Sequence, residues 1–254
     1  AEKLELNSDV EKIYSAGSAF AALKKNSGKV VVWGPGGYGG SLNDLATDEK
    51  NELDSDVEKI YSNQYAFAAL KKDGKVVVWG DASFGGSLTA DEKLELNSDV
   101  DLNPVVKIYS TIIAFAALKK DGSVVTWGAS DYGDVLSGVE KIYSTSNAFA
   151  ALKKDGSVVA WGEAETGGTV PDGLSDLPLT DDPKVVKIYS NGHAFAALKD
   201  DGEFVVWGGL NSSLFSVGTD FDITPIDITH LNSDDLEDAS LLDDYPEFAS
   251  IPVA

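Results

Sequence analysis

The feature that most constrains this chain is a motif that occurs five times almost unchanged. Each copy reads V-x-K-I-Y-S, then a few variable residues, A-F-A-A-L-K, a turn, and V-V-x-W-G. Successive tryptophans lie 46, 48, 34 and 46 residues apart, at Trp33, Trp79, Trp127, Trp161 and Trp207. Repetition at this period indicates small units that stack and cover one another's faces.

Within one unit the local pattern is that of β-strands. In the second copy, residues 59–62, 66–72 and 76–79 predict three short strands. Asp73-Gly74 separates the last two, as Asp-Gly does in the next three copies, and this dipeptide predicts a two-residue type I′ hairpin.

The alternation of side chains predicts how the units pack. Ala66, Ala68 and Leu70 point to one face of their strand, and Phe67 and Ala69 point to the other. The next strand is apolar on both faces, which is typical of a strand between packed layers. We therefore expect the alanines of one unit to receive the phenylalanine and tryptophan of a neighbour.

The segments that separate the copies are related to one another. Residues 48–57 read DEKNELDSDV and residues 91–100 read DEKLELNSDV. Thr47 and Thr89 precede them and are predicted to cap short helical turns. We interpret both segments as surface excursions on one rim of the array.

Composition excludes several classes of function. The 254-residue chain has no cysteine, which excludes disulfides, thiolate metal sites and cysteine nucleophiles. Its net charge of −22 disfavours nucleic acid and anionic membranes. The charge favours a solvated acidic surface, with cation binding or a basic protein partner as the alternatives. No run reaches 18 apolar residues, so no membrane span is predicted.

Residues 146–168, SNAFAALKKDGSVVAWGEAETGG, resemble the repeat of the regulator of chromosome condensation family. The resemblance extends over residues 10–218, and its most specific parts are Ala-Leu-x-x-Asp-Gly and the Trp-Gly strand. As a short, three-stranded repeat it is also similar to the β-lactamase inhibitor branch of the superfamily, and as a run of tandem copies it is similar to repeats of large marine microbial surface proteins. The resemblance implies a β-propeller that binds proteins through loops on one face.

The chain also departs from the family pattern. The family's repeated histidine is replaced by alanine, at Ala19, Ala66, Ala114, Ala148 and Ala194. A basic arm and the loop for nucleotide exchange are absent from the sequence, so that activity is not expected here. The prediction is an all-β fold, a β-propeller-like array of five three- to four-stranded repeats over residues 1–218.

The last part of the chain, residues 219–254, carries only a decayed trace of the motif. It is interpreted as a degenerate sixth repeat or as an acidic segment that closes or caps the array. The array then either closes on itself or stays open and is completed by a neighbour.

Any function is expected in the positions where the copies differ. The last residue of the variable triplet before each A-F-A-A-L-K strand gives four candidate partner contacts: Tyr65, Ile113, Asn147 and His193. The loops after the Trp-Gly strand add Tyr38, Phe84 and Tyr132. Variable loops of stacked units gather on one face, where they could bind a partner. For the rings of Tyr38, Phe84 and Tyr132, packing on the adjacent unit is favoured, and a binding ledge is the alternative.

Catalysis and cofactors are not indicated. Nucleophile-elbow, phosphate-loop and dinucleotide motifs are absent from the sequence, and so repetitive a chain offers no single catalytic constellation. Asp234, Asp235, Glu237 and Asp238 carry the oxygen ligands that Ca²⁺ takes. They lack EF-hand spacing, so an acidic segment that is solvated or contacts a partner is favoured over a Ca²⁺ site.

The sequence thus favours a non-catalytic interaction or scaffold module that docks on a partner or a large assembly. One alternative is a repeat segment of a giant surface adhesin or spacer protein, and a weaker one is a propeller hydrolase or lyase with acidic residues. A chain that begins at Ala1 and contains no methionine suggests processing, which favours the extracellular space or an organelle lumen over the cytoplasm.

Overall fold

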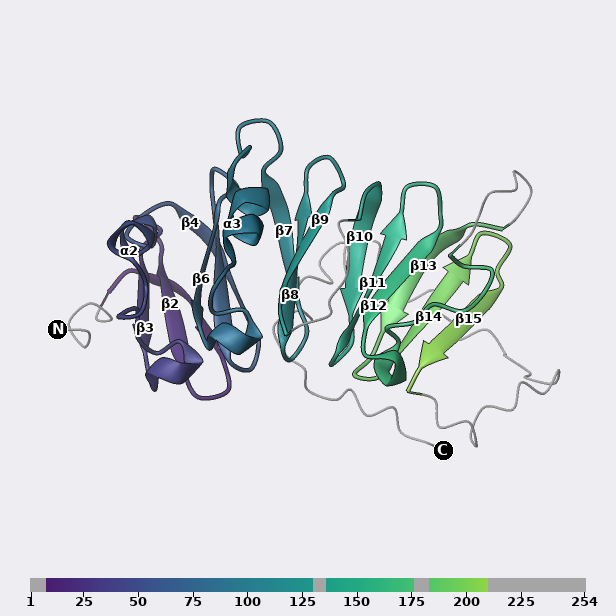
Figure 1. Cartoon of the computed structure of the whole chain (residues 1–254), viewed down its shortest axis with the longest axis horizontal. Coiled ribbons are helices and arrows are strands. Elements are labelled where there is room, and N and C mark those ends of the chain that lie inside the picture. The colour runs from purple at the N-terminus through teal and green to yellow at the C-terminus, as the bar shows by residue number, and fades with distance from the viewer. Residues whose placement is uncertain (1–7, 130–135, 176–182, 210–254) are drawn as a thin grey trace. The chain divides into compact units, whose positions relative to one another are not determined.

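In the computed structural model, which describes residues 8–129, 136–175 and 183–209, the chain forms five three-stranded antiparallel sheets. Each sheet is built from one copy of the motif, with its strands in chain order, and the sheets follow one another side by side (Figure 1). This confirms the predicted all-β array of repeated units.

The strands have nearly the same bounds in every copy. The first two sheets contain β1 (Val10–Ser15), β2 (Phe20–Lys24), β3 (Val30–Trp33), β4 (Val57–Ser62), β5 (Ala66–Lys71) and β6 (Val76–Gly80). The third and fourth contain β7 (Val105–Ser110), β8 (Ala114–Lys119), β9 (Val124–Gly128), β10 (Val139–Ser144), β11 (Ala148–Lys153) and β12 (Val158–Gly162). The fifth contains β13 (Val185–Ser190), β14 (Ala194–Lys199) and β15 (Phe204–Gly208).

The two faces of each sheet differ in the size of their side chains. We call the side that carries the isoleucine, phenylalanine and tryptophan of the motif the aromatic face; in the second sheet these are Ile60, Phe67 and Trp79. The other side, with Ala66 and Ala68, is the alanine face. This division of the second strand is the one that the sequence predicted.

A β-bulge that the sequence did not reveal completes the aromatic face. The pairing of β4 with β5 shifts register between Val57 and Lys59, and every other sheet has the same shift. The extra residue places Val57 and Ile60 on the same side, although three positions separate them.

Successive sheets pack with the aromatic face of the later one on the alanine face of the earlier one. Four hydrophobic clusters of this kind join the five sheets. The phenylalanine is 0, 0, 0 and 1% exposed in Phe67, Phe115, Phe149 and Phe195. Each such ring contributes roughly 1.5–3 kcal/mol by burial, and it fits because the facing residues are alanine.

The phenylalanine and tryptophan of the aromatic face form a fixed pair. Phe67 lies opposite Trp79 in the β5–β6 ladder, with ring centroids 5.2 Å apart. The Trp79 indole N–H donates to the carbonyl of Gly39, 3.0 Å away in the turn after the preceding sheet. A side chain at Gly39 would meet the Phe67 ring at 2.6 Å, so this turn requires glycine.

The same indole hydrogen bond recurs at two more interfaces, as Trp127–Gly85 at 3.2 Å and Trp207–Gly167 at 2.9 Å. At Trp161 the indole nitrogen is buried without a partner among the described residues. The turn that would supply its acceptor falls in residues 130–135, outside the described residues.

The Asp-Gly hairpins differ from the predicted type. Lys71 and Lys75 close a three-residue loop, in which Gly74 donates to the Lys71 carbonyl at 2.9 Å. Gly74 has a φ of +84°, but Asp73 does not have a positive φ, so the type I′ prediction is wrong. The Asp73 carboxylate instead accepts the Lys75 N–H at 3.1 Å, and this side-chain bond fixes the turn.

The segments between sheets carry short helices, namely α2 (Thr47–Glu52), α3 (Ala90–Asn97) and the one-turn helices η1 (Gly36–Tyr38), η2 (Ala82–Phe84) and η3 (Ala164–Thr166). Thr89 caps α3 as predicted, but Ala46 takes the cap position of α2, so the prediction for Thr47 is wrong by one residue. The two segments that carry α2 and α3 are more than surface excursions, because each buries a leucine between sheets. Leu53 is 1% exposed and Leu96 is 0% exposed.

Replacement of the turn glycine tests the role of the hairpin. Gly156 has a φ of +89°, and a Cβ there would lie 2.6 Å from the Cβ of Lys184. We expect Gly156→Val to lower the free energy of unfolding by about 1–3 kcal/mol in a urea titration. Gly37→Ala is the control, since Gly37 lacks both the positive φ and a neighbour within 4 Å. Equal effects of the two substitutions would contradict the turn assignment.

Candidate functional site

Three aromatic side chains from separate loops of the first two sheets stack on one another. The Tyr65 ring lies 5.8 Å from Tyr38 and 4.3 Å from Phe84, measured between centroids. All three residues are half-buried. We call this group the aromatic stack; it combines one member of the variable triplets with two members of the loops after the Trp-Gly strands.

Local sequence places each ring of the stack. Tyr38 and Phe84 are the last residues of η1 and η2, and each one-turn helix ends at a glycine with positive φ. The Asp81 carboxylate accepts the N–H of Ser83 at 2.9 Å and starts η2. Tyr65 lies between β4 and β5, in the short loop that turns the chain into the buried alanine strand.

Asn63 ties these loops together. Its side-chain oxygen accepts the backbone N–H of Tyr65 at 2.8 Å and that of Ala66 at 2.7 Å. Its amide nitrogen donates to the Phe84 carbonyl at 2.7 Å. Because Asn63 is only 7% exposed, these bonds are shielded from water and hold the stack in one geometry.

The other predicted contact residues do not join the stack. Ile113 is partly buried against the cluster between the third and fourth sheets, and Asn147 donates to the Glu163 carboxylate at 3.0 Å. His193 is exposed at the fifth sheet. Tyr132 lies outside the described residues.

Sequence reasoning missed Asn63, although a signal was present. The prediction concerns the last residue of each variable triplet, whereas the first residue anchors the loop. Thr111, Thr145 and Asn191 occupy the same place and accept the same backbone N–H, at 3.1, 3.1 and 2.8 Å. The signal was the preference of this position for Asn and Thr, whose side chains bond locally to the backbone.

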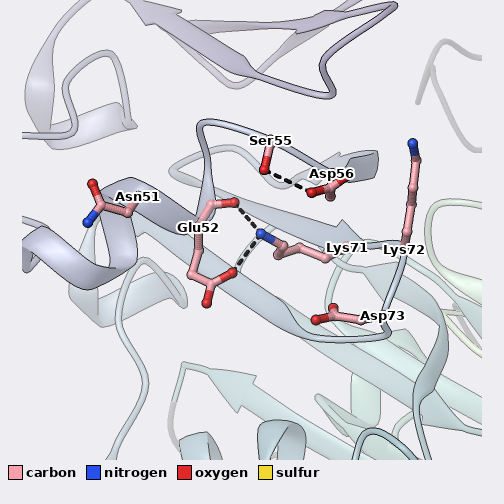
Figure 2. A pocket seen from close by; sticks show the side chains of 7 residues that line it. All are labelled: Asn51, Glu52, Ser55, Asp56, Lys71, Lys72 and Asp73. Atoms are coloured by element: carbon pink, nitrogen blue, oxygen red, sulfur yellow. Dashed lines mark hydrogen bonds and ion pairs between the residues drawn. The ribbon is translucent and has the colours of Figure 1, made fainter.

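A second candidate is an open polar pocket of about 440 Å³ beside the α2 helix. Figure 2 shows its lining, namely Asn51, Glu52, Ser55, Asp56, Lys71, Lys72 and Asp73. The Lys71 ammonium donates to the Glu52 carbonyl at 2.6 Å and lies 2.6 Å from the Glu52 carboxylate. Lys71 therefore caps the C-terminal end of α2, where a cation is favourable.

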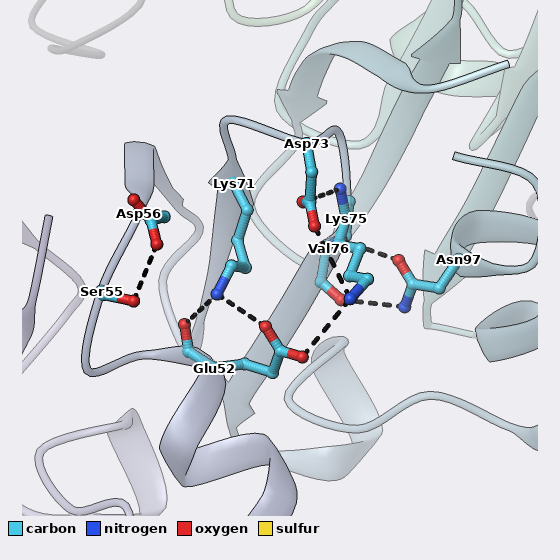
Figure 3. A network of polar contacts seen from close by, with 8 residues as sticks. All are labelled: Glu52, Ser55, Asp56, Lys71, Asp73, Lys75, Val76 and Asn97. Atoms are coloured by element: carbon cyan, nitrogen blue, oxygen red, sulfur yellow. Dashed lines mark hydrogen bonds and ion pairs between the residues drawn. The ribbon is translucent and has the colours of Figure 1, made fainter. Parts of the chain in front are cut away.

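The charges of this pocket compensate one another. Lys75 lies 3.5 Å from Glu52 and 3.6 Å from Asp73, and Figure 3 shows the resulting network. Next to it, Asn97 bonds both the N–H and the carbonyl of Val76, at 2.8 and 3.0 Å. The network fixes the helices α2 and α3 to the start of β6.

The pKa shifts in this network do not favour proton transfer at neutral pH. The hydrogen bond from Lys71 lowers the pKa of Glu52, and the charge of Glu52 raises the pKa of Lys75. Both shifts stabilise the charged forms, whereas a general acid or base needs a pKa moved toward neutrality. The network therefore has a structural role. We call the ion pairs of Glu52 with Lys71 and Lys75 the clamp, because they hold α2 to the neighbouring strands.

In the part of the chain that the structure describes, no group of three or more acidic or histidine side chains is placed to hold a metal ion. The carboxylates proposed for Ca²⁺, Asp234, Asp235, Glu237 and Asp238, lie outside the described residues, as does all of 219–254. Within the described ranges, no helix is long and apolar enough to cross a membrane.

The clamp predicts a pH-dependent stability difference. A carboxyl whose pKa is lowered in the folded state stabilises it above its unfolded pKa, and that stability is lost as the pH falls through the folded pKa. We expect Glu52→Gln to lower the free energy of unfolding by about 1 kcal/mol near pH 7. The difference from wild type should shrink as the pH is lowered from about 5 to about 3.

Urea titrations at several pH values measure this difference. Glu58→Gln, which removes an exposed carboxylate from β4, is the control and should change stability by less than about 0.5 kcal/mol. A Glu52→Gln deficit that is the same at acid and neutral pH would contradict the assigned role.

Comparison with known proteins identifies the architecture. Prp20p from Saccharomyces cerevisiae has a TM-score of 0.51 and 22% identity over 85% of this chain and 60% of its own. Yeast RCC1 (Prp20) in a complex with Kap60 has a TM-score of 0.50, 22% identity, and coverage of 85% and 59%. Human WBSCR16 follows with 0.48, 21%, 78% and 61%.

The likenesses to the two yeast structures show the fold, which is an RCC1-type β-propeller architecture with five three-stranded blades. The chain spans about 60% of the length of Prp20p. Neither the known family models nor the curated protein sequences contain a match to it. The finer resemblance to the short-bladed branch and to marine surface repeats stays a prediction.

Proposed function

We propose that this protein is a non-catalytic interaction module that docks on a partner protein, with the aromatic stack of Tyr38, Tyr65 and Phe84 at the centre of the contact. The observation that carries the proposal is that stack, because it presents three half-exposed rings from three loops in one fixed geometry. Tyrosine is enriched among residues that dominate binding energy, and rigid aromatics lose little entropy on binding.

The chemistry of the rest of the chain supports a partner with a basic surface. The net charge of −22 attracts cationic surfaces over distances near the Debye length and repels nucleic acid. Structures with the same fold add an analogy, since Prp20p binds Gsp1p and histones and yeast RCC1 binds Kap60. The analogy concerns fold only, so the site itself has to carry the argument.

Photo-crosslinking tests the docking surface directly. A benzophenone amino acid at position 65 should give a discrete adduct with a protein from the native source, and added salt should weaken it. The same probe at Leu102, which is 76% exposed on a loop outside the stack, is the control. Identical adducts from both positions, or none from position 65, would refute the proposed surface.

The identified partner then allows a quantitative test. Loss of a ring at the centre of an interface costs 2 kcal/mol or more, so Tyr65→Ala should weaken the affinity by about 30-fold. Asn63→Ala leaves all three rings present but releases the loop, and should also weaken binding. Leu102→Ala should not. Unchanged affinity of both stack variants would place the contact elsewhere.

The alternative of a repeat array has one observation in its favour. The outer faces of the first and last described sheets carry exposed apolar side chains, Phe20 and Phe204 among them.

A further inference from the structure

The aromatic face of the first sheet is uncovered. Ile13 is 55% exposed and Phe20 is 43% exposed, and Trp33, whose ring stacks on Phe20 at 5.3 Å, is half-buried. At the same positions in the second sheet the exposed fractions are 1, 0 and 1%, for Ile60, Phe67 and Trp79. The difference arises because the first sheet covers the second, whereas no sheet formed by the described residues covers the first.

The alanine face of the fifth sheet is uncovered as well. Tyr189 is 51% exposed, Phe204 is 55% exposed and Val206 is 38% exposed. In the third sheet the residues equivalent to the first two are Tyr109, at 9%, and Val124, at 1%. The fifth sheet therefore presents to solvent the surface that elsewhere receives a Phe–Trp pair.

The loops show the same unfinished pattern in their backbone hydrogen bonds. A ladder joins the middle residues of successive variable triplets, as Gly17→Gln64, Gln64→Ile112, Ile112→Ser146 and Ser146→Gly192, at 2.8, 3.2, 2.8 and 3.0 Å from N to O. Each N–H donates to the next sheet in the series. Gly192, exposed at the last sheet, carries the donor that would extend this ladder to another Gly17 carbonyl.

We propose that these two faces bind each other between copies of the chain, so that the first sheet of one molecule stacks on the fifth sheet of the next. The interface would be a fifth instance of the contact that each molecule already contains four times. A second copy supplies the matching isoleucine, phenylalanine and tryptophan. Residues 211–254 of the same chain carry only a decayed trace of the motif in their sequence.

The geometry of this contact dictates how the assembly grows. Two different faces meet, so the interface is heterologous, and each added copy again exposes one face of each kind. The result is a ring or an open series rather than an obligatory dimer. Because every copy carries a net charge of −22 and the interface is apolar, salt should strengthen the association by screening the repulsion.

Sedimentation velocity of the intact chain measures the assembly. We expect species at integer multiples of 26.8 kDa whose fraction rises with protein concentration and with salt. A wild-type chain that stays monomeric over the whole concentration range and at high salt would overturn the proposal. That outcome includes closure of the faces within one molecule or by its own C-terminal residues.

Two single-face variants give the decisive test. Ile13→Asp with Phe20→Asp blocks the aromatic face, and Phe204→Asp with Val206→Asp blocks the alanine face; all four positions are exposed, so both variants should fold. Each variant alone should be monomeric. Mixed together, they retain one intact face of each kind and should form a one-to-one complex that grows no further.

The other outcomes of this test are equally clear. If one variant still self-associates, the contact joins like faces and the proposal is wrong. If the mixture shows no complex although wild type assembles, the contact lies elsewhere. Circular dichroism and the melting midpoint verify that both variants fold, and Leu102→Asp, on an exposed loop, should assemble like wild type.

Assembly and partner binding are separate claims. The aromatic stack is formed by loops of the first two sheets and includes none of the residues named for either exposed face. Tyr65→Ala should therefore leave the sedimentation profile unchanged, and failure of one proposal would leave the other standing.

Discussion

The contact on which this structure depends is the packing of the Phe–Trp pair of one sheet on the alanine face of the preceding sheet. It requires residues of opposite size on the two faces of one sheet, and the motif supplies them by simple alternation. A single three-stranded sheet has both faces apolar, so each must be covered by a neighbour. Cohesion between sheets thus comes from one interface used four times, without disulfides, and the indole hydrogen bond to a glycine carbonyl fixes its alignment at the three interfaces where both partners are described.

This division of labour leaves function to the residues that vary. The repeated tyrosine, phenylalanine and tryptophan are used in packing inside the array. What differs between copies lies in the loops, and among the described residues three loops of the first two sheets bring the rings of Tyr38, Tyr65 and Phe84 together. The charged residues around α2, which line a polar pocket, pair with one another and hold α2 to the sheet. In the part of the chain that the structure describes, the outer faces of the first and fifth sheets are apolar and have no partner sheet.

The sequence predicted the repeat, the three strands and the two unlike faces, because each follows from local alternation and spacing. It did not predict the bulge beside Val57, which depends on pairing between strands. Nor did it predict the three-residue turn at Asp73-Gly74, where a positive φ at the glycine alone combines with a hydrogen bond from the Lys75 N–H to the aspartate side chain. Tyr38, Tyr65 and Phe84 were singled out separately as loop aromatics. Their meeting in one stack is a tertiary fact, as is the role of Asn63, since nothing local connects these loops.

A matched pair of substitutions measures the central contact most directly. Ala68 and Ala196 occupy the same place in the same six-residue strand, but the third sheet covers Ala68, whereas Ala196 lies half-buried on the uncovered face. In dilute monomer, Ala68→Leu should lower the free energy of unfolding by about 1–3 kcal/mol through overpacking, and Ala196→Leu should change it by less than about 0.5 kcal/mol. Equal losses at the two positions would contradict the claim that packing between sheets holds the array together.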